Sequence, residues 1–169
     1  KVAFTGSDVT GSAIYAQAAK HMKKVTMELG GKSPNIVFAD AHIDNAVKGV
    51  ISGIFAATGQ TCIAGSRLLV QKSIHDEFVE KLVELGSSAK IGDPSSFDTQ
   101  VGPVTNVPQF KKVLDYIDIA KGEGAEAVLG GGTPTGPEIG EGWFVEPTIF
   151  TGVKNEMRIA QEEVFGPVL

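Results

Sequence analysis

The stretch Gly59-Gln60-Thr61-Cys62 organises the rest of the chain, because Cys62 is the single cysteine among 169 residues. On its amino-terminal side, apolar residues recur at steps of three and four, the period of a helix that buries one face; they are Ile43, Ala46, Val47, Val50, Ile51, Ile54 and Phe55. Gly59 is a natural end for this helix. On the carboxyl side, residues 66–71 (SRLLVQ) predict a short buried strand. Cys62 is therefore expected in a loop anchored at both ends, where a thiol can act as a nucleophile.

A second stretch, MELGGKSPN at residues 27–35, bears on how Cys62 is interpreted. A lone cysteine is more often a small buried apolar side chain than a nucleophile. Here, however, Glu28 stands directly before a Gly-Gly pair and a Ser-Pro turn, where the backbone can approach another group closely. A cysteine nucleophile needs a nearby base, and a carboxylate can serve as one.

Four sequence motifs together resemble the aldehyde dehydrogenase superfamily. They are FTGS, MELGGKSPN, GQTC with its cysteine 34 residues after Glu28, and EEVFGPV, in the order of that family and across essentially the whole chain. The resemblance implies an α/β fold, with a largely parallel sheet flanked by helices in the catalytic domain, preceded by the last βα unit of a Rossmann-like cofactor domain. We therefore expect residues 1–28 to end the NAD(P)-binding domain, residues 29–169 to form a truncated catalytic domain, and the chain to be an internal piece of a larger enzyme.

The resemblance also implies a reaction: oxidation of an aldehyde to a carboxylic acid with NAD or NADP. Cys62 is expected to attack the aldehyde, and Glu28 to act as the general base that hydrolyses the resulting thioester. Thr61 and Ile63 flank the nucleophile and are expected to line the path of a small or aliphatic aldehyde.

Residues at both ends of the chain are implied to bind the cofactor. By resemblance, Thr5, Gly6 and Ser7 contact the nicotinamide ribose and phosphate, and Val9 flanks the adenine side. Read without the family, residues 5–11 lack the G-x-G-x-x-G fingerprint and fit an ordinary turn in which Ser7 or Asp8 caps a helix.

Three further cofactor contacts follow from the resemblance. Leu29 is expected to offer its backbone carbonyl to the nicotinamide carboxamide, Glu163 to accept hydrogen bonds from the ribose hydroxyls, and Phe165 to pack against the ribose and ring. Charge-assisted bonds from a diol to a carboxylate are about twice as strong as neutral ones. Without the family, Glu162 and Glu163 read as a solvated turn.

The remaining sequence predicts alternating helices and strands, which is typical of an α/β domain with largely parallel strands. Ser73 and Asp76 have the spacing of a capping box at the start of a helix over residues 73–89. Near the amino terminus we expect a strand over 2–4 and then a helix that carries Ile14, Ala18 and Met22. The other expected elements are strands over 23–27 and 35–38, a loop over 91–105, a helix over 106–121, a strand over 125–129, a glycine-rich hairpin connection over 130–142 and a strand over 143–150.

Composition excludes several classes of protein. The net charge of −5 gives no basic surface for nucleic acid or an anionic membrane, and no stretch approaches the roughly 20 apolar residues of a membrane span. One cysteine fits a reducing compartment, so we expect a cytoplasmic protein. The three histidines show no metal-ligand spacing, so no metal site is expected. By resemblance, the parent enzyme is expected to be a homodimer or homotetramer.

Two other functions stay open at this stage. One is the acylating branch of the superfamily, in which coenzyme A resolves the thioester; its members typically lack a glutamate at the position of Glu28. The other is a non-catalytic relative serving as a binding or structural module, for which loss of Cys62 or Glu28 would be expected.

Overall fold

The structure is a computed structural model that describes residues 1–136, 139 and 141–169. It divides the chain into two compact units, Lys1–Gly31 and Lys32–Leu169. The division falls three residues after the boundary expected at 28/29, beyond the Gly-Gly pair. The identity of these units as parts of a cofactor domain and a catalytic domain stays a prediction.

The first unit is a β-α-β arrangement of β1 (Val2–Thr5), α1 (Asp8–Ala19) and β2 (Val25–Glu28). The two strands are parallel, with Val2 opposite Val25 and Thr5 opposite Glu28, and a parallel pair requires a crossover such as α1. The prediction that Met22 lies on this helix is wrong. The helix ends at Ala19 with Lys20 as its C-cap, and Met22 follows in a left-handed turn with φ of 49°.

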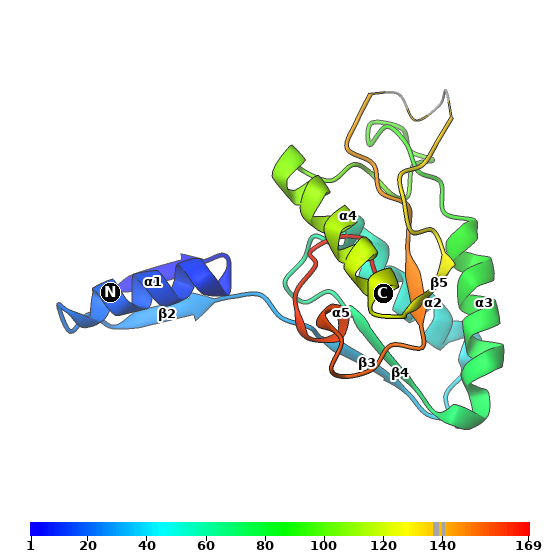
Figure 1. Ribbon diagram of the computed structural model, residues 1–169, viewed down its shortest axis with the longest axis horizontal. Helices are drawn as coiled ribbons and strands as arrows, with labels where there is room; N and C mark the ends of the chain where they lie inside the picture. Colours follow the sequence, from blue (N-terminus) through cyan, green and yellow to red (C-terminus); the bar gives the residue numbers. More distant parts are fainter. Residues whose placement is uncertain (137–138, 140) are drawn as a thin grey trace. The chain divides into compact units, whose positions relative to one another are not determined.

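The second unit contains the other elements (Figure 1). In chain order these are β3 (Pro34–Val37), α2 (Ile43–Phe55), the 3₁₀ turn η1 (Ala56–Gly59), β4 (Arg67–Val70), the 3₁₀ turn η2 (Lys72–Ile74), α3 (His75–Ser87), α4 (Val107–Gly122), β5 (Glu126–Leu129), β6 (Ile149–Thr151) and α5 (Arg158–Gln161). Strands β3 and β4 lie side by side and are parallel, whereas β5 and β6 are antiparallel. The predicted α/β class is confirmed.

Two groups of buried side chains hold the second unit together. One joins the apolar face of α2 to Phe78 and Leu82 of α3, both fully buried, as the three- and four-residue spacing predicted. The other gathers around Val113 and Ile117 of α4. The segment between α3 and α4 contributes to both groups, Val101 to the first and Val104 to the second.

Three local predictions need correction. Ser73 does not cap a helix: it lies inside η2, its hydroxyl accepts a hydrogen bond from Gln71 Nε2 at 3.2 Å, and α3 begins at His75. The strand expected over 143–150 is confined to β6, because Pro147 has no N–H for a ladder and Trp143 instead accepts a bond from the Val104 amide. Helix α2 ends at Phe55, four residues before Gly59.

The glycine-rich segment 130–142 connects the antiparallel strands β5 and β6, as the hairpin prediction required. Within it, Pro137, Glu138 and Gly140 lie outside the described residues. Over the described part of the chain, no helix has both the length and the apolar character needed to cross a bilayer. The same residues hold no group of three or more His, Cys, Asp or Glu side chains arranged to bind a metal.

Candidate functional site

Cys62 lies at the exposed tip of the loop between η1 and β4 and is a free thiol. Its neighbours Thr61 and Ile63 are also exposed, Ile63 to 79%. Among the described residues, neither the thiol nor the backbone amide of Cys62 takes part in a hydrogen bond. Both groups are therefore available to a ligand.

The chain reaches Cys62 through a left-handed turn. Ala56 leaves the helical conformation with ψ of 141°, and Ala57, Thr58 and Gly59 then have φ of 50°, 57° and 69°. Left-handed backbone is uncommon for residues other than glycine, and for a β-branched residue such as threonine it is an outlier.

Two side chains tie this turn to the segment that follows α3. The Thr58 hydroxyl donates to the carbonyl of Gly102 at 3.1 Å. The Gln60 side chain accepts from the amide of Thr105 at 2.9 Å and donates to the carbonyl of Ala57 at 3.3 Å. The turn is thus held to a part of the chain more than 40 residues away.

Beyond Cys62 the loop is fixed by the MELGGKSPN motif. Gly65 donates its amide to the carbonyl of Gly53 in α2 at 3.0 Å, and its own carbonyl accepts from Asn35 Nδ2 at 3.2 Å. A Cβ on Gly65 would collide with the Asn35 side chain, so a larger residue there would displace Asn35. Asn35 therefore braces the loop that carries Cys62.

The EEVFGPV motif meets the same loop from another direction. A Cβ built on Gly59 would overlap the carbonyl of Gly166, so the two backbones are in direct contact. Gly166 in turn packs on Val113 of α4. Residues placed 107 positions apart in the sequence thus form one packed unit beside the cysteine loop.

Helix α4 holds the turn that contains Glu163 and Phe165. Gln109 Nε2 donates to the carbonyls of Val164 and Phe165 at 2.8 and 2.9 Å. Phe165 is left-handed, with φ of 61°. Both Glu163 and Phe165 are half-buried. Gln109 therefore stabilises a turn that the Phe165 backbone would otherwise disfavour.

A charged cluster fixes the residue before Glu163. Arg158 Nη2 lies 2.8 Å from Glu162 Oε2, and the Tyr116 hydroxyl donates to the same oxygen at 2.5 Å. The hydrogen bond from Arg158 and then the one from Tyr116 lower the pKa of Glu162 to about 2. Lys112 and Arg158 lie near the Tyr116 ring, 5.7 and 5.4 Å from its centroid.

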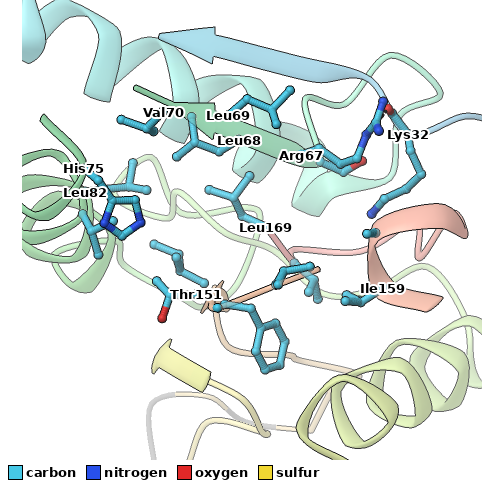
Figure 2. Close-up of a pocket in the computed structure, with 18 of the residues that line it drawn as sticks. Lys32, Arg67, Leu68, Leu69, Val70, His75, Leu82, Thr151, Ile159 and Leu169 are labelled. Carbon is cyan, nitrogen blue, oxygen red and sulfur yellow. Dashed lines mark hydrogen bonds between the residues drawn. The ribbon is translucent and has the colours of Figure 1, made fainter. Parts of the chain in front are cut away.

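Lys32 of the MELGGKSPN motif also belongs to the second unit. Its burial, and then the charge of Arg67, lower its pKa to about 8, against an opposing effect of Glu163. Arg67 Nε donates to the Lys32 carbonyl at 2.8 Å. Lys32 and Arg67 lie at one end of a cavity of about 190 Å³ between β4 and β6 (Figure 2). Cys62 does not line this cavity.

The other predicted site residues lie in the first unit. Glu28 is the exposed last residue of β2, opposite Thr5 of β1, and its carbonyl accepts from the Gly6 amide at 3.1 Å. Ser7 is the N-cap of α1 and accepts from the amide of Thr10 at 3.2 Å, which is the capping role considered for it above. Leu29 packs against Gly11.

The start of α1 leaves backbone amides without an intrahelical acceptor. The amides of Asp8 and Val9 occupy the first two helical positions, where no intrahelical acceptor exists, and the helix dipole favours an anion there. The Val9 side chain is 76% exposed. The Asp8 carboxylate in the first turn is the one group that opposes a phosphate.

The structure adds four residues that the sequence did not single out, namely Thr58, Gln60, Asn35 and Gln109. Each is a polar side chain that fixes the backbone of a motif distant in sequence. Asn35, Gln60 and Thr58 lie within or next to the motifs quoted above, and this position was the one sequence feature that could have indicated their role. Gln109 lies on an amphipathic helix with no such signal.

Comparisons with known proteins agree with these motifs. The sequence model of the aldehyde dehydrogenase family matches residues 1–169. The betaine aldehyde dehydrogenases of Brucella anthropi and Mesorhizobium japonicum are 52% and 51% identical over 169 residues, all of this chain and 35% of each relative. The chain thus spans about a third of the length of the curated relatives it matches.

Solved structures show the same similarity. A mutant aldehyde dehydrogenase from Bacillus cereus is 44% identical, with a TM-score of 0.95 over 100% of this chain and 34% of that one. A betaine aldehyde dehydrogenase from Staphylococcus aureus in complex with NAD+ is 43% identical, with a TM-score of 0.97 over 99% of this chain and 34% of that one.

Proposed function

The chain belongs to the aldehyde dehydrogenase family, and from this premise we propose that the full-length protein that carries it oxidises an aldehyde to a carboxylic acid with NAD+. One observation supports the proposal most strongly. In the second unit, parts of three motifs pack around the loop of the single cysteine: Asn35 bonds Gly65, and Gly166 contacts Gly59. An exposed thiol held in this way is suited to nucleophilic attack.

The chemistry of Cys62 determines the first step. Its thiolate attacks the aldehyde carbon and forms a tetrahedral thiohemiacetal, whose oxyanion needs hydrogen-bond donors. The backbone amide of Cys62 has no other partner among the described residues and can supply one donor. When bound, NAD+ supplies the hydride acceptor that this oxidation requires, and Cys62 is left as a thioester.

Glu28 is proposed to complete the cycle as a general base. It takes a proton from water, the resulting hydroxide attacks the thioester carbon, and the carboxylic acid leaves while Cys62 is regenerated. Glu28 can also accept the thiol proton before the first attack. This role requires Glu28 of the first unit and Cys62 of the second to face one substrate.

Cofactor binding is assigned to residues of both units. In the first, Thr5, Gly6 and Ser7 with the start of α1 would hold ribose and phosphate, Val9 the adenine side and Leu29 the carboxamide. In the second unit, Glu163 would accept hydrogen bonds from the hydroxyls of the nicotinamide ribose, and Phe165 would pack against that ribose and the nicotinamide ring. Of the two cofactors we propose NAD, because the structure of the Staphylococcus aureus relative contains NAD+.

The substrate is proposed to be betaine aldehyde or a small aldehyde like it. The most similar relatives reported above are named for that substrate and are 51–52% identical. Thr61 and Ile63 flank Cys62 and offer one hydroxyl and one short apolar side chain to the aldehyde. We further propose a cytoplasmic homodimer or homotetramer, the state expected from the family resemblance.

Site-directed variants of the full-length protein test this function. Cys62→Ala should abolish aldehyde-dependent NADH formation, by at least about 10⁴-fold, because the alanine side chain has no nucleophilic atom to attack the aldehyde. Glu28→Gln should slow hydrolysis, so that mass spectrometry finds an acyl adduct on Cys62 after mixing with betaine aldehyde and NAD+. Normal turnover by Cys62→Ala would remove the thiol from the mechanism, and absence of the adduct would remove Glu28 from the hydrolytic step.

A further inference from the structure

The turn before Cys62 has an unusual backbone conformation. Three successive residues, Ala57, Thr58 and Gly59, adopt left-handed φ values. Two of them carry a Cβ, and the middle one is β-branched, the type for which this conformation is least favourable. Strained residues of this kind persist only when the surrounding structure fixes them, and they concentrate at functional sites.

Thr58 is one of the two side chains through which the surrounding structure fixes the turn, and it is the one that stands on the left-handed backbone itself. It is only 5% exposed, and its hydroxyl donates to the Gly102 carbonyl at 3.1 Å. Gly102 lies between Val101 and Val104, each 1% exposed and each in a different one of the two core groups. The acceptor is therefore anchored in the rigid interior, and Thr58 transfers that rigidity to the turn.

The direction of the chain at Cys62 depends on this anchor. If the turn relaxed to right-handed or extended backbone, the two residues between Gly59 and Cys62 would carry the thiol and its amide to new positions. After Cys62, the loop is held by the bond from the Ala64 amide to the Thr61 carbonyl and by the contacts of Gly65. Before it, the approach is set by the turn, together with the bond from the Thr105 amide to Gln60 and the packing of Gly166 on Gly59.

We propose that Thr58 is a positioning residue for Cys62: its bond to Gly102 holds the left-handed turn that orients the thiol and the Cys62 amide toward a bound aldehyde. The inference rests on the proposed function, which supplies the reaction that the orientation serves. It predicts that loss of the hydroxyl impairs attack on the aldehyde while leaving the thiol itself accessible and ionisable.

Thr148 provides a matched control. Among the described residues of the second unit it is the other buried polar residue, 0% exposed. Its hydroxyl donates to the Glu146 carbonyl at 2.8 Å and accepts from the Gly131 amide at 3.0 Å. Its amide and carbonyl bond Pro167 and Leu169 in extended backbone. A Thr→Val change at either position removes one buried hydroxyl, but only the change at Thr58 affects a left-handed turn beside the cysteine.

The test compares Thr58→Val, Thr58→Ser and Thr148→Val in the full-length protein. The pre-steady-state rate of NADH formation with betaine aldehyde reports attack by the oriented thiol. The rate of alkylation by iodoacetamide, which forms an S–C bond and releases iodide, reports only thiolate content and access. A positioning role predicts a 10- to 100-fold lower NADH burst rate for Thr58→Val, with alkylation within threefold of wild type.

The remaining variants separate orientation from stability. Thr58→Ser keeps the hydroxyl and should stay within about threefold of wild type in both assays, and Thr148→Val should leave both rates within twofold even where it lowers the urea midpoint. If Thr58→Val does not fold, Thr58→Gly, which accepts the left-handed backbone without the hydroxyl, should still show at least a tenfold lower burst rate.

Three outcomes would overturn the assignment: a Thr58→Val or Thr58→Gly burst rate within twofold of wild type, an equal loss in Thr148→Val, or a loss of alkylation in proportion to the loss of burst rate. Failure of the proposed function has a different signature. In that case Cys62→Ala keeps its turnover or wild type has none, and the positioning role falls with it.

Discussion

The turn at the start of α1 and the loop that carries Cys62 are fixed in different ways. The first is held by its own helix cap, Ser7 to Thr10, and by the adjacent parallel strand. The second is held by partners 30, 44 and 45 residues away, and by Gly166 still farther along. A nucleophile loop shaped by distant partners is rigid only when the whole unit is folded, whereas a capped turn forms with its own helix.

The contact between Gly59 and Gly166 should give the largest effect. Gly59→Ala places a Cβ on the Gly166 carbonyl and forces alanine into a φ of 69°, so we expect the free energy of unfolding to fall by about 3–5 kcal/mol. Aldehyde oxidation should fall with it. Urea unfolding followed by far-UV circular dichroism measures the change.

Gly49→Ala is the matched control for that variant. Gly49 lies within α2, and nothing is found within 4 Å of its Cβ position. Alanine in a helix interior is better than glycine by about 0.5–1 kcal/mol, so this variant should be as stable as wild type or more stable. If Gly59→Ala matched it, the loop would not depend on its distant contact.

The Asn35 brace should give the next largest effect. Asn35→Asp keeps the side-chain shape but faces the Gly65 carbonyl with a carboxylate in place of a donor, which should lower stability by about 1–3 kcal/mol at pH 7. The loss should shrink below pH 4, because a protonated carboxyl can donate to that carbonyl. Urea midpoints at pH 7 and pH 4 measure both parts.

Asn106→Asp makes the same chemical change at a local cap. Asn106 is the N-cap of α4 and accepts from the Gln109 amide at 2.9 Å, a role that aspartate fills equally well. Its stability should stay close to that of wild type at pH 7. If Asn35→Asp and Asn106→Asp lost equal stability, the bond from Asn35 to Gly65 would be no more sensitive to this change than a local helix cap.

The same contrast explains what could be predicted from the sequence. The apolar period of residues 43–55 predicted α2 correctly, and Asn106 marked the start of α4, because both signals act within a few residues. The bond from Thr58 to Gly102 could not be predicted in this way, because the sequence around a threonine does not indicate which distant carbonyl its hydroxyl will bond. The ladder expected over 143–150 failed for a related reason: Trp143 and Thr148 find partners elsewhere in the chain.

The local cap of α1 should give a smaller effect. Ser7→Ala removes the acceptor for the Thr10 amide and should loosen the first turn of α1 by about 1 kcal/mol, because this exposed bond is replaced in part by water. Hydrogen exchange of the α1 amides measures the change. Ser12→Ala, at an exposed helical position, should leave that exchange unchanged, and faster exchange there would show that the helix is sensitive to any serine loss.

Glu162 combines both kinds of contact in one residue, and its exposed position makes the expected effect the smallest. Arg158 is a local partner one helical turn away, and Tyr116 is a distant one. The folded pKa of about 2 lies below the reference value of 4.5. The stability that Glu162 contributes is therefore present above about pH 4.5 and lost as the pH falls toward 2, so the melting temperatures of wild type and Glu162→Gln should converge over that range.

The two arms can be ranked by titration. The bond from Arg158 is the larger cause of the low pKa, so Arg158→Met should raise the pKa of Glu162 more than Tyr116→Phe does, as NMR of the side-chain carboxyl would show. If Tyr116→Phe raised the pKa of Glu162 more, the distant partner would dominate the electrostatics of Glu162, as distant partners fix the cysteine loop. The expected order means that the local partner Arg158 mainly determines the pKa of Glu162. The adjacent turn with Glu163 is instead held by Gln109 of α4, which bonds the carbonyls of Val164 and Phe165.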